Sequence, residues 1–283
     1  MFFLATRRRR RSPKRLIRFL FLLIIIFCAA FFLSGGSAIF SAHTWQNASG
    51  FLPRPTQSVP ANEMGDNVTE NPKMSERLSR VLFLQRAVNS RVNKHAPHYV
   101  KLEDIPDSMQ QAVVAVEDKR FYSHHGFDFE GILRAALVNL QSGEIEEGAS
   151  TITQQLVKNL FLSHEQSFGR KAEEFVLALD MEWCYSKDEI LEMYLNTIYY
   201  GSSYYGIGPA AEGYFGKKPR DLQLPEAAML AGLPNAPSLY SPYVDFMMAK
   251  KRQFVVLDAM VNCGYIDKGI AEDAKIKPIY LAH

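Results

Sequence analysis

An uncharged apolar segment near the N-terminus constrains this chain more than any other feature. Residues Phe19 to Leu33 contain no charged side chain, and the apolar run continues through a Ser-Gly-Gly-Ser stretch to Phe40. As one helix, residues 19–40 would extend roughly 33 Å at ~1.5 Å per residue, enough to cross a ~30 Å hydrocarbon core. We therefore expect a transmembrane anchor at 19–40.

The residues before this segment predict its orientation. Residues 1–18 carry eight basic side chains and no acidic one. Positive charge beside a membrane span is retained on the cytoplasmic side, so we expect a basic cytoplasmic tail at 1–18 and an exported remainder. A charge run in this position is more typical of a topology signal than of nuclear targeting or nucleic-acid binding.

A cleavable signal peptide is the alternative reading of the same segment. Gly36, Ser37 and Ala38 are small residues that would suit a cleavage site. The apolar run, taken to Phe40, is longer than the ~7–15 residues usual for the core of a signal peptide. Its length favours an uncut anchor.

Charge and cysteine content exclude two classes of protein. The whole chain has a net charge of +2, but removing the basic tail leaves −6 for residues 19–283, so the body offers no general attraction for nucleic acid. Cys28 lies in the apolar run, and Cys184 and Cys263 stand alone. No C-x-x-C or Cys/His spacing indicates a zinc site, and a disulfide scaffold is excluded.

The rest of the chain is predicted to be a linker followed by a helical domain. Four prolines fall within residues 41–72, which is typical of a linker, and apolar residues then recur at helical spacing over 73–93, so we assign 41–95 to a linker and a covering helix. Within the domain at 96–283, no convincing period-2 run occurs, and the fold is expected to be mainly α. We expect helices at 105–116, 129–140, 168–185, 187–196, 224–233 and 246–262, and one beginning at Thr151 with Gln154 completing a capping box.

Three polar clusters stand out from this helical pattern. The first runs from Glu117 to Gly126, the second from Gly148 to Gln155 with Lys158 after it, and the third from Arg170 to Glu174. Taken singly, a surface charge, a capped helix and a surface ion pair explain them equally well.

Together the clusters resemble the lysozyme-like, penicillin-binding-protein-type glycosyltransferase family that polymerises bacterial peptidoglycan. The pattern E-D-x-x-F-x-x-H-x-G matches residues 117–126, G-x-S-T-x-T-Q-Q matches 148–155 and R-K-x-x-E matches 170–174. Two further blocks match at 187–196 and 231–237. The resemblance covers roughly residues 100–275, so the chain looks like the monofunctional, membrane-anchored form. Only the acidic loop at 141–147 is unusual beside a pyrophosphate substrate.

The resemblance implies a substrate and a reaction. The family uses lipid II, a disaccharide-peptide on a polyprenyl pyrophosphate. The 4-hydroxyl of one lipid II attacks the anomeric carbon of the growing glycan chain, which forms a β-1,4 link with inversion and releases the lipid pyrophosphate. Glu117 would be the general base. Glu174 would be a second catalytic carboxylate that positions the leaving group directly or through a divalent cation such as Mg or Mn, and no organic cofactor is implied.

The same motif matching assigns the other site residues. Lys158 and Arg170, with Lys171 as a weaker candidate, would hold the donor pyrophosphate. Four residues of the second motif would shape the donor side of the cleft, and three residues of the first would support the loop that carries Glu117. These are, in order, Ser150, Thr151, Gln154 and Gln155, then Asp118, Phe121 and His124. Tyr194, Asn196 and the 232–237 block are interpreted as supporting the fold.

The family fold is two helical lobes with the cleft between them, the smaller lobe partly sunk in the bilayer. We expect its membrane face within 127–170, at Phe127, Phe129, Ile132, Leu133, Leu160, Phe161 and Leu162. The implied location is the bacterial cytoplasmic membrane, with the catalytic domain outside. Expected partners are lipid II, the growing glycan chain, the bilayer and other cell-wall synthesis proteins, with no nucleic acid.

Two other functions remain open. A lysozyme-like peptidoglycan hydrolase would also use a glutamate in a helical fold, but it needs no pyrophosphate pocket, so Lys158 and Arg170 argue against it. A noncatalytic membrane-anchored scaffold would not need Glu117 and Glu174 in register with the other motifs.

Overall fold

The computed structural model describes residues 79–142, 150–162 and 168–282. The chain divides into two compact units, Met1–Pro55 and Thr56–His283, and all described residues belong to the second. The predicted cytoplasmic tail, the predicted span at 19–40 and the predicted linker therefore lie outside the described residues. Among the residues that are described, no helix is long and apolar enough to cross a membrane.

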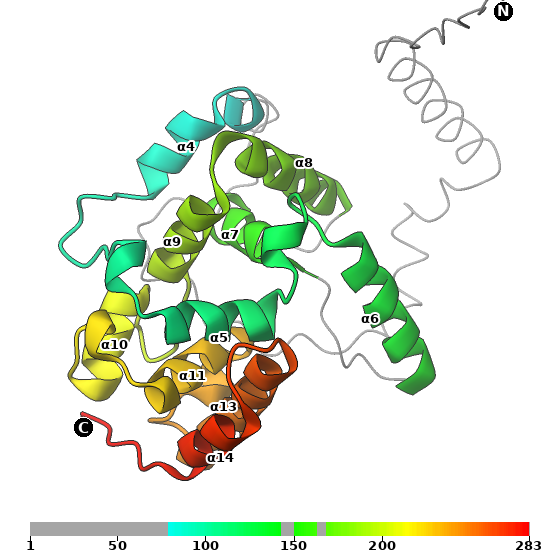
Figure 1. The fold of residues 1–283 in the computed structure, drawn as a ribbon. Coiled ribbons are helices and arrows are strands. Elements are labelled where there is room, and N and C mark those ends of the chain that lie inside the picture. Colours follow the sequence, from blue (N-terminus) through cyan, green and yellow to red (C-terminus); the bar gives the residue numbers. More distant parts are fainter. Residues whose placement is uncertain (1–78, 143–149, 163–167, 283) are drawn as a thin grey trace, which may run out of the picture. The chain divides into compact units, whose positions relative to one another are not determined.

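The described part is built from helices, which confirms the prediction of a mainly α fold (Figure 1). No strand occurs in it, only isolated bridges between His125 and Phe127 and between Tyr199 and Tyr205. The helices are α4 (Leu84–Arg91), α5 (Asp107–Glu117), α6 (Phe129–Ser142), α7 (Ile152–Phe161), α8 (Phe168–Cys184), α9 (Lys187–Thr197), α10 (Ile207–Phe215), α11 (Leu224–Gly232), α12 (Pro237–Tyr240), α13 (Phe246–Asn262) and α14 (Lys268–Ile276). Short 3-10 turns lie at Leu102–Asp104, Phe121–Ser123, Pro219–Asp221 and Leu233–Asn235.

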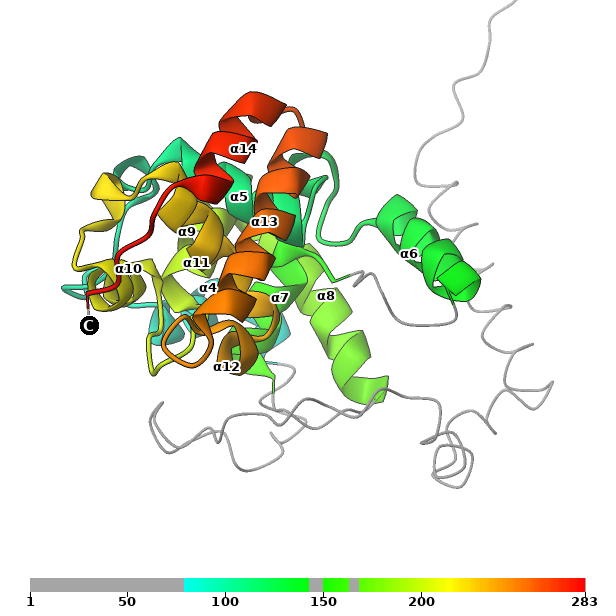
Figure 2. The same ribbon diagram turned by 90° about the horizontal axis from the view of Figure 1, so that it is seen from below.

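The helices pack in two groups. Helix α5 lies against α11 and α13, while α7 lies against α8 and α9. In Figure 1 the second group lies above the first, and Figure 2, turned by 90°, shows α6 extending away from both. The C-terminal end of α5 and the N-terminal end of α7 come together where the two groups meet.

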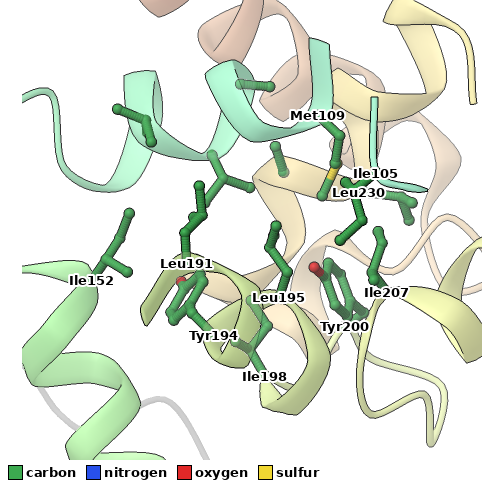
Figure 3. Packing of buried hydrophobic residues seen from close by; sticks show 14 of the residues in the cluster. Ile105, Met109, Ile152, Leu191, Tyr194, Leu195, Ile198, Tyr200, Ile207 and Leu230 are labelled. Atoms are coloured by element: carbon green, nitrogen blue, oxygen red, sulfur yellow. The ribbon is translucent and has the colours of Figure 1, made fainter. Parts of the chain in front are cut away.

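Helix α9 shows why this sequence forms this core. A capping box between Ser186 and Glu189 starts the helix, and its apolar residues at three- and four-residue spacing are fully buried. Figure 3 shows Leu191, Tyr194 and Leu195 of this helix in one apolar cluster with Ile152 of α7 and Met109 of α5.

The covering helix predicted at 73–93 is interrupted within the described residues by a turn at Phe83, after which α4 continues. Leu84 and Val88 are buried in the same core as the rest of the domain. Arg91 Nη1 donates to the carbonyl of Leu160 at 3.0 Å, and a cation suits that carbonyl-rich C-terminal end of α7. The helix therefore fastens the end of α7.

Three residues assigned to the membrane face lie in the core instead. Leu160, Phe161 and Leu162 are 6%, 3% and 8% exposed, so that part of the prediction is wrong. An apolar helix face that packs on protein has the same spacing as one that contacts lipid. Phe129 and Leu133 on α6 are both 65% exposed, and their contact with a membrane stays a prediction.

Three helices of the described part, α10, α12 and α14, were not predicted. Helix α10 contains Gly208, Pro209 and Gly213, which are usually helix breakers. Glycine is needed at 213 because a Cβ there would lie 2.1 Å from Cζ of Tyr204. Helix α14 is only nine residues long and has no preceding apolar run to reveal it.

Candidate active site

Glu117 is the last residue of α5, and two hydrogen bonds to the carboxylate of its neighbour Asp118 fix that end of the helix. The Asp118 carboxylate accepts from the backbone N–H of Ile152 at 3.0 Å, so it caps the start of α7. It also bonds Nε2 of His124 at 2.9 Å, and Asp118 and His124 are both buried. This carboxylate therefore ties α5, α7 and the loop between them into one unit.

The loop that follows Glu117 is held against α7 and α8. Thr151 Oγ1 donates to the carbonyl of Gly126 at 2.7 Å and accepts from the N–H of Gln154 at 3.1 Å. Gly126 has a φ of +82°, and a Cβ at this position would lie 3.0 Å from the carbonyl oxygen of Ala178, so both backbone and packing require glycine. Phe121 is fully buried, with the Lys187 ammonium 4.5 Å from its ring centroid.

Two adjacent glutamines of α7 each hold one of the two candidate catalytic carboxylates. Gln155 Nε2 donates to Oε2 of Glu117 at 2.9 Å. Gln154 Nε2 donates to Oε1 of Glu174 at 3.2 Å, while its Oε1 closes the capping box by accepting from the N–H of Thr151 at 3.1 Å. The predicted capping box is thus confirmed, and it has a second use in orienting the amide that holds Glu174.

Burial raises the pKa of Glu117. The hydrogen bond from Gln155 and the charges of Arg252 and Lys158 oppose this effect, whereas the charge of Asp118 adds to it. Oε1 of Glu117 is buried and has no hydrogen-bond partner within the described part of the chain. A carboxylate with a raised pKa and one uncommitted oxygen is suited to accept a proton.

Three cations gather around Glu174, which is almost completely buried. Arg170 Nη1 lies 3.5 Å from Oε2 of Glu174, and Lys171 pairs with Oε1. The side chain of Lys158 is exposed at the surface of α7. Its surroundings nevertheless remove enough water to lower the pKa of its ammonium, with Glu174 opposing this shift and Arg170 and Lys171 reinforcing it. Three cations and one carboxylate leave an excess of positive charge that suits a pyrophosphate.

A divalent cation does not fit the residues around Glu174. Its two oxygens already accept from Gln154, Arg170 and Lys171, so the neighbours are donors and cations rather than metal ligands. The described segments also contain no group of three or more His, Cys, Asp or Glu side chains that could hold a metal ion.

A pocket of about 270 Å³ opens beside Glu117. It is lined by Ala115, Val116, Glu117, Asp118, Lys119, Asp128, Gly131, Arg134, Ser150, Thr151, Asn235, Arg252, Val255 and Ala259. Of the predicted site residues, Glu117, Asp118, Ser150 and Thr151 line this pocket. Lys158, Arg170, Lys171 and Glu174 form the separate cation cluster, which α7 connects to Glu117 through Gln154 and Gln155.

Several lining residues of this pocket were not predicted from the sequence, among them Arg134, Asn235 and Arg252. Arg134 is the one basic residue in the sequence of α6, and Arg252 follows Lys250 and Lys251 in α13. Neither position was distinguished in the sequence from basic residues that face solvent. Asn235 belongs to the 231–237 block and was interpreted as supporting the fold. The place of Arg252 in the pocket wall depends on the packing of α13 against α5, which joins residues far apart in the sequence.

Two residues predicted to support the fold, Asn196 and Tyr194, form hydrogen bonds within the domain. Asn196 accepts from the N–H of Val100 at 2.8 Å and donates to the carbonyl of Val100 at 2.8 Å, which ties the entry to the domain onto α9. Tyr194 is fully buried, and its hydroxyl donates to Oε1 of Gln155 at 3.0 Å.

Comparison with known proteins matches the same region. The family described as Transglycosylase matches residues 85–261. A putative transglycosylase from Cupriavidus necator is 45% identical over 188 residues, which are 66% of this chain and 81% of that protein. Penicillin-binding protein 1A from Vibrio cholerae is 48% identical over 180 residues, 64% of this chain and 22% of that protein. Penicillin-binding protein 1A from Neisseria flavescens is 51% identical over 168 residues, 59% of this chain and 21% of that protein, so the chain spans about a fifth of these two relatives.

Proposed function

The chain belongs to the transglycosylase family, and we propose on that basis that it is a peptidoglycan glycosyltransferase that polymerises lipid II into β-1,4 glycan strands. One observation carries the proposal. A buried carboxylate with one uncommitted oxygen, Glu117, is joined by adjacent amides of α7 to a cluster of cations around Glu174. This arrangement combines a base for a hydroxyl with a binding site for a diphosphate leaving group.

In the proposed reaction, Oε1 of Glu117 takes the proton from the 4-hydroxyl of the acceptor lipid II. The freed oxygen attacks the anomeric carbon of the growing chain from the face opposite the lipid pyrophosphate. The new glycosidic bond forms as the bond to the pyrophosphate oxygen breaks, which inverts the configuration. General-base assistance of this kind contributes ~10²–10⁴-fold to rate.

The negative charge that develops on the departing pyrophosphate would be stabilised by Lys158 and Arg170. Glu174 pairs with Arg170 through one of its oxygens, and its charge opposes the lowering of the pKa of Lys158. No step in this scheme passes through a metal ion. The lysozyme-like, two-lobed arrangement is part of the same proposal, supported by two groups of helices that meet at Glu117.

Purified protein incubated with lipid II in detergent tests the function. The expected products are long glycan strands and free polyprenyl pyrophosphate. A hydrolase would instead shorten preformed peptidoglycan strands and create new reducing ends without consuming lipid II. A scaffold would do neither, so the two assays together separate the three functions.

We propose a location in the bacterial cytoplasmic membrane, with residues 19–40 as an uncut single-pass anchor. The protein is then expected to stay with membranes after a high-salt wash, and its intact mass should include residues 1–40. Recovery of a chain that begins near Ile39 would instead establish a cleaved signal peptide. Deletion of residues 1–40 should lower activity on long-chain lipid II more than on a short-chain soluble analogue, because a tether raises local concentration at the bilayer.

A further inference from the structure

Tyr194 has a polar contact that its position in the core does not require. Its ring is fully buried among apolar residues of the cluster shown in Figure 3. Its hydroxyl nevertheless donates to Oε1 of Gln155, 39 residues away in sequence, at 3.0 Å. The other end of the same amide donates to Oε2 of Glu117 at 2.9 Å. A continuous chain of hydrogen bonds therefore runs from the core to Glu117.

The direction of this chain depends on which end of the Gln155 amide faces Glu117. If the amide rotated by 180°, its carbonyl oxygen would face an ionised carboxylate, and the two acceptors would repel each other. The same rotation would leave the Tyr194 O–H without its acceptor in an apolar environment, which carries a desolvation penalty. Burial raises the pKa of Tyr194 well above its ordinary value, so the phenol stays protonated and remains a donor.

We propose that Tyr194 is a positioning residue for Glu117. Its hydroxyl orients the Gln155 amide so that this amide holds Oε2 of Glu117 and leaves Oε1 to accept the proton. The inference rests on the proposed function, because it assumes that Glu117 is the base.

The neighbouring amide, that of Gln154, is also oriented by the protein, but by a different contact. Gln154 is oriented by the capping box at Thr151 and then donates to Glu174. Gln155 has no such local partner, and α9 supplies its orienting contact through Tyr194. Each of the two adjacent amides thus has one end committed to the protein scaffold and the other to a candidate catalytic carboxylate.

The pH dependence of activity is the specific readout for this role. The hydrogen bond from Gln155 lowers the pKa of Glu117 against the dominant effect of burial. The charged groups that shift the pKa of Glu117 are Asp118 on the adjoining loop, Lys158 on α7 and Arg252 on α13. Lys119, Asp128 and Arg134 line the same pocket. A change at Tyr194 alters none of these groups. Loss of the orienting hydroxyl should weaken the amide contact, raise the pKa of Glu117 and move the acidic limb of the kcat/KM profile to higher pH.

Tyr194→Phe tests the proposal in the full chain, because it removes one oxygen and keeps the ring. We expect kcat for lipid II to fall roughly tenfold, less than the loss expected on removing the base itself, with KM changed by less than about twofold. The acidic limb should shift to higher pH. An unshifted limb would overturn the proposal, because a purely structural role for Tyr194 would lower the amount of folded enzyme without changing its pH profile.

Tyr200→Phe is the matched control. Tyr200 lies in the same buried cluster (Figure 3), and its hydroxyl has no hydrogen-bond partner among the described residues. Removing it should leave the pH profile unchanged. Equal shifts of the acidic limb in the Tyr194→Phe and Tyr200→Phe variants would mean that any loss of a buried hydroxyl changes the packing around Glu117. That result would contradict the proposal.

A second variant keeps the proposal testable if Tyr194→Phe folds poorly. Gln155→Met removes the amide and should itself shift the acidic limb to higher pH. In that background Tyr194→Phe should cause no further shift, whereas additive shifts would show that Tyr194 acts independently of Gln155. An unshifted acidic limb in Gln155→Met would also overturn the proposal, because the amide would then not affect the pKa of Glu117.

Failure of this inference can be told apart from failure of the proposed function. If Glu117→Gln retains full polymerisation, the base is misassigned and the role of Tyr194 falls with it. If Glu117→Gln is inactive but Tyr194→Phe keeps the wild-type pH profile, Glu117 remains the base and only the positioning role is rejected.

Discussion

Replacing Glu117 with glutamine is expected to lower lipid II polymerisation by at least ~10²-fold while the protein remains folded. Glutamine keeps the shape of the side chain, and its carbonyl oxygen can still accept from Nε2 of Gln155. It cannot take a proton from the acceptor hydroxyl. Rates measured in detergent with purified lipid II give the comparison, and near-normal glycan synthesis by Glu117→Gln would exclude Glu117 as the base.

The same substitution should stabilise the fold at neutral pH. Burial raises the pKa of Glu117 in the folded protein above its ordinary value. Stability from this group is therefore full below the unfolded pKa and is lost as pH rises through the folded pKa, because the native state must then bury a charge. Glutamine avoids that cost, so the stability advantage of Glu117→Gln should be small in acid and grow as pH rises. Thermal unfolding at several pH values measures it.

Glu212→Gln is the control for both measurements. Glu212 lies on the exposed surface of α10, so Glu212→Gln makes the same chemical change outside the site. It should leave the rate and the pH dependence of stability unchanged. A similar gain in stability with Glu212→Gln would mean that the effect at 117 reflects net charge rather than burial.

The helical architecture follows from the sequence where apolar spacing and cap signals agree. Thr151 and Gln154 predicted a capped helix from four residues alone, because the capping box is a local interaction. Helix α10 was hidden because Gly208 and Gly213 are required by close contacts with residues elsewhere in the chain. Local patterns cannot report a contact whose partner is distant.

In the candidate site, too, the local pattern was predicted from the sequence and the contacts between distant residues were not. Motif matching indicated Gln154 and Gln155 as substrate-binding residues, and it did not predict that each amide holds a carboxylate from another helix. That pairing arises because α7 packs between the end of α5 and the side of α8. Leu160 and its neighbours were misassigned to the membrane for a related reason, since only packing tells a core face from a lipid face.

Lys158→Ala and Arg170→Ala are each expected to reduce polymerisation on the order of 10²-fold, as for loss of one preorganised charge at a developing anion. Because that charge appears as the pyrophosphate departs, kcat should fall more than KM rises. Lys171→Ala should cost less, because the Lys171 side chain is 53% exposed and its charge is screened by water, whereas the surroundings of Lys158 remove enough water to lower its pKa.

The two large losses should differ in their pH dependence. The charge of Lys158 lowers the pKa of Glu117, so Lys158→Ala should also move the acidic limb of the kcat/KM profile to higher pH. Arg170 pairs with Glu174 and is not among the groups that shift Glu117, so Arg170→Ala should lower the rate without moving that limb. Lys251→Ala, on the exposed surface of α13, is the control for loss of one positive charge. Full activity in both Lys158→Ala and Arg170→Ala would place the pyrophosphate elsewhere, for which the arginines of the pocket beside Glu117 would be the next candidates.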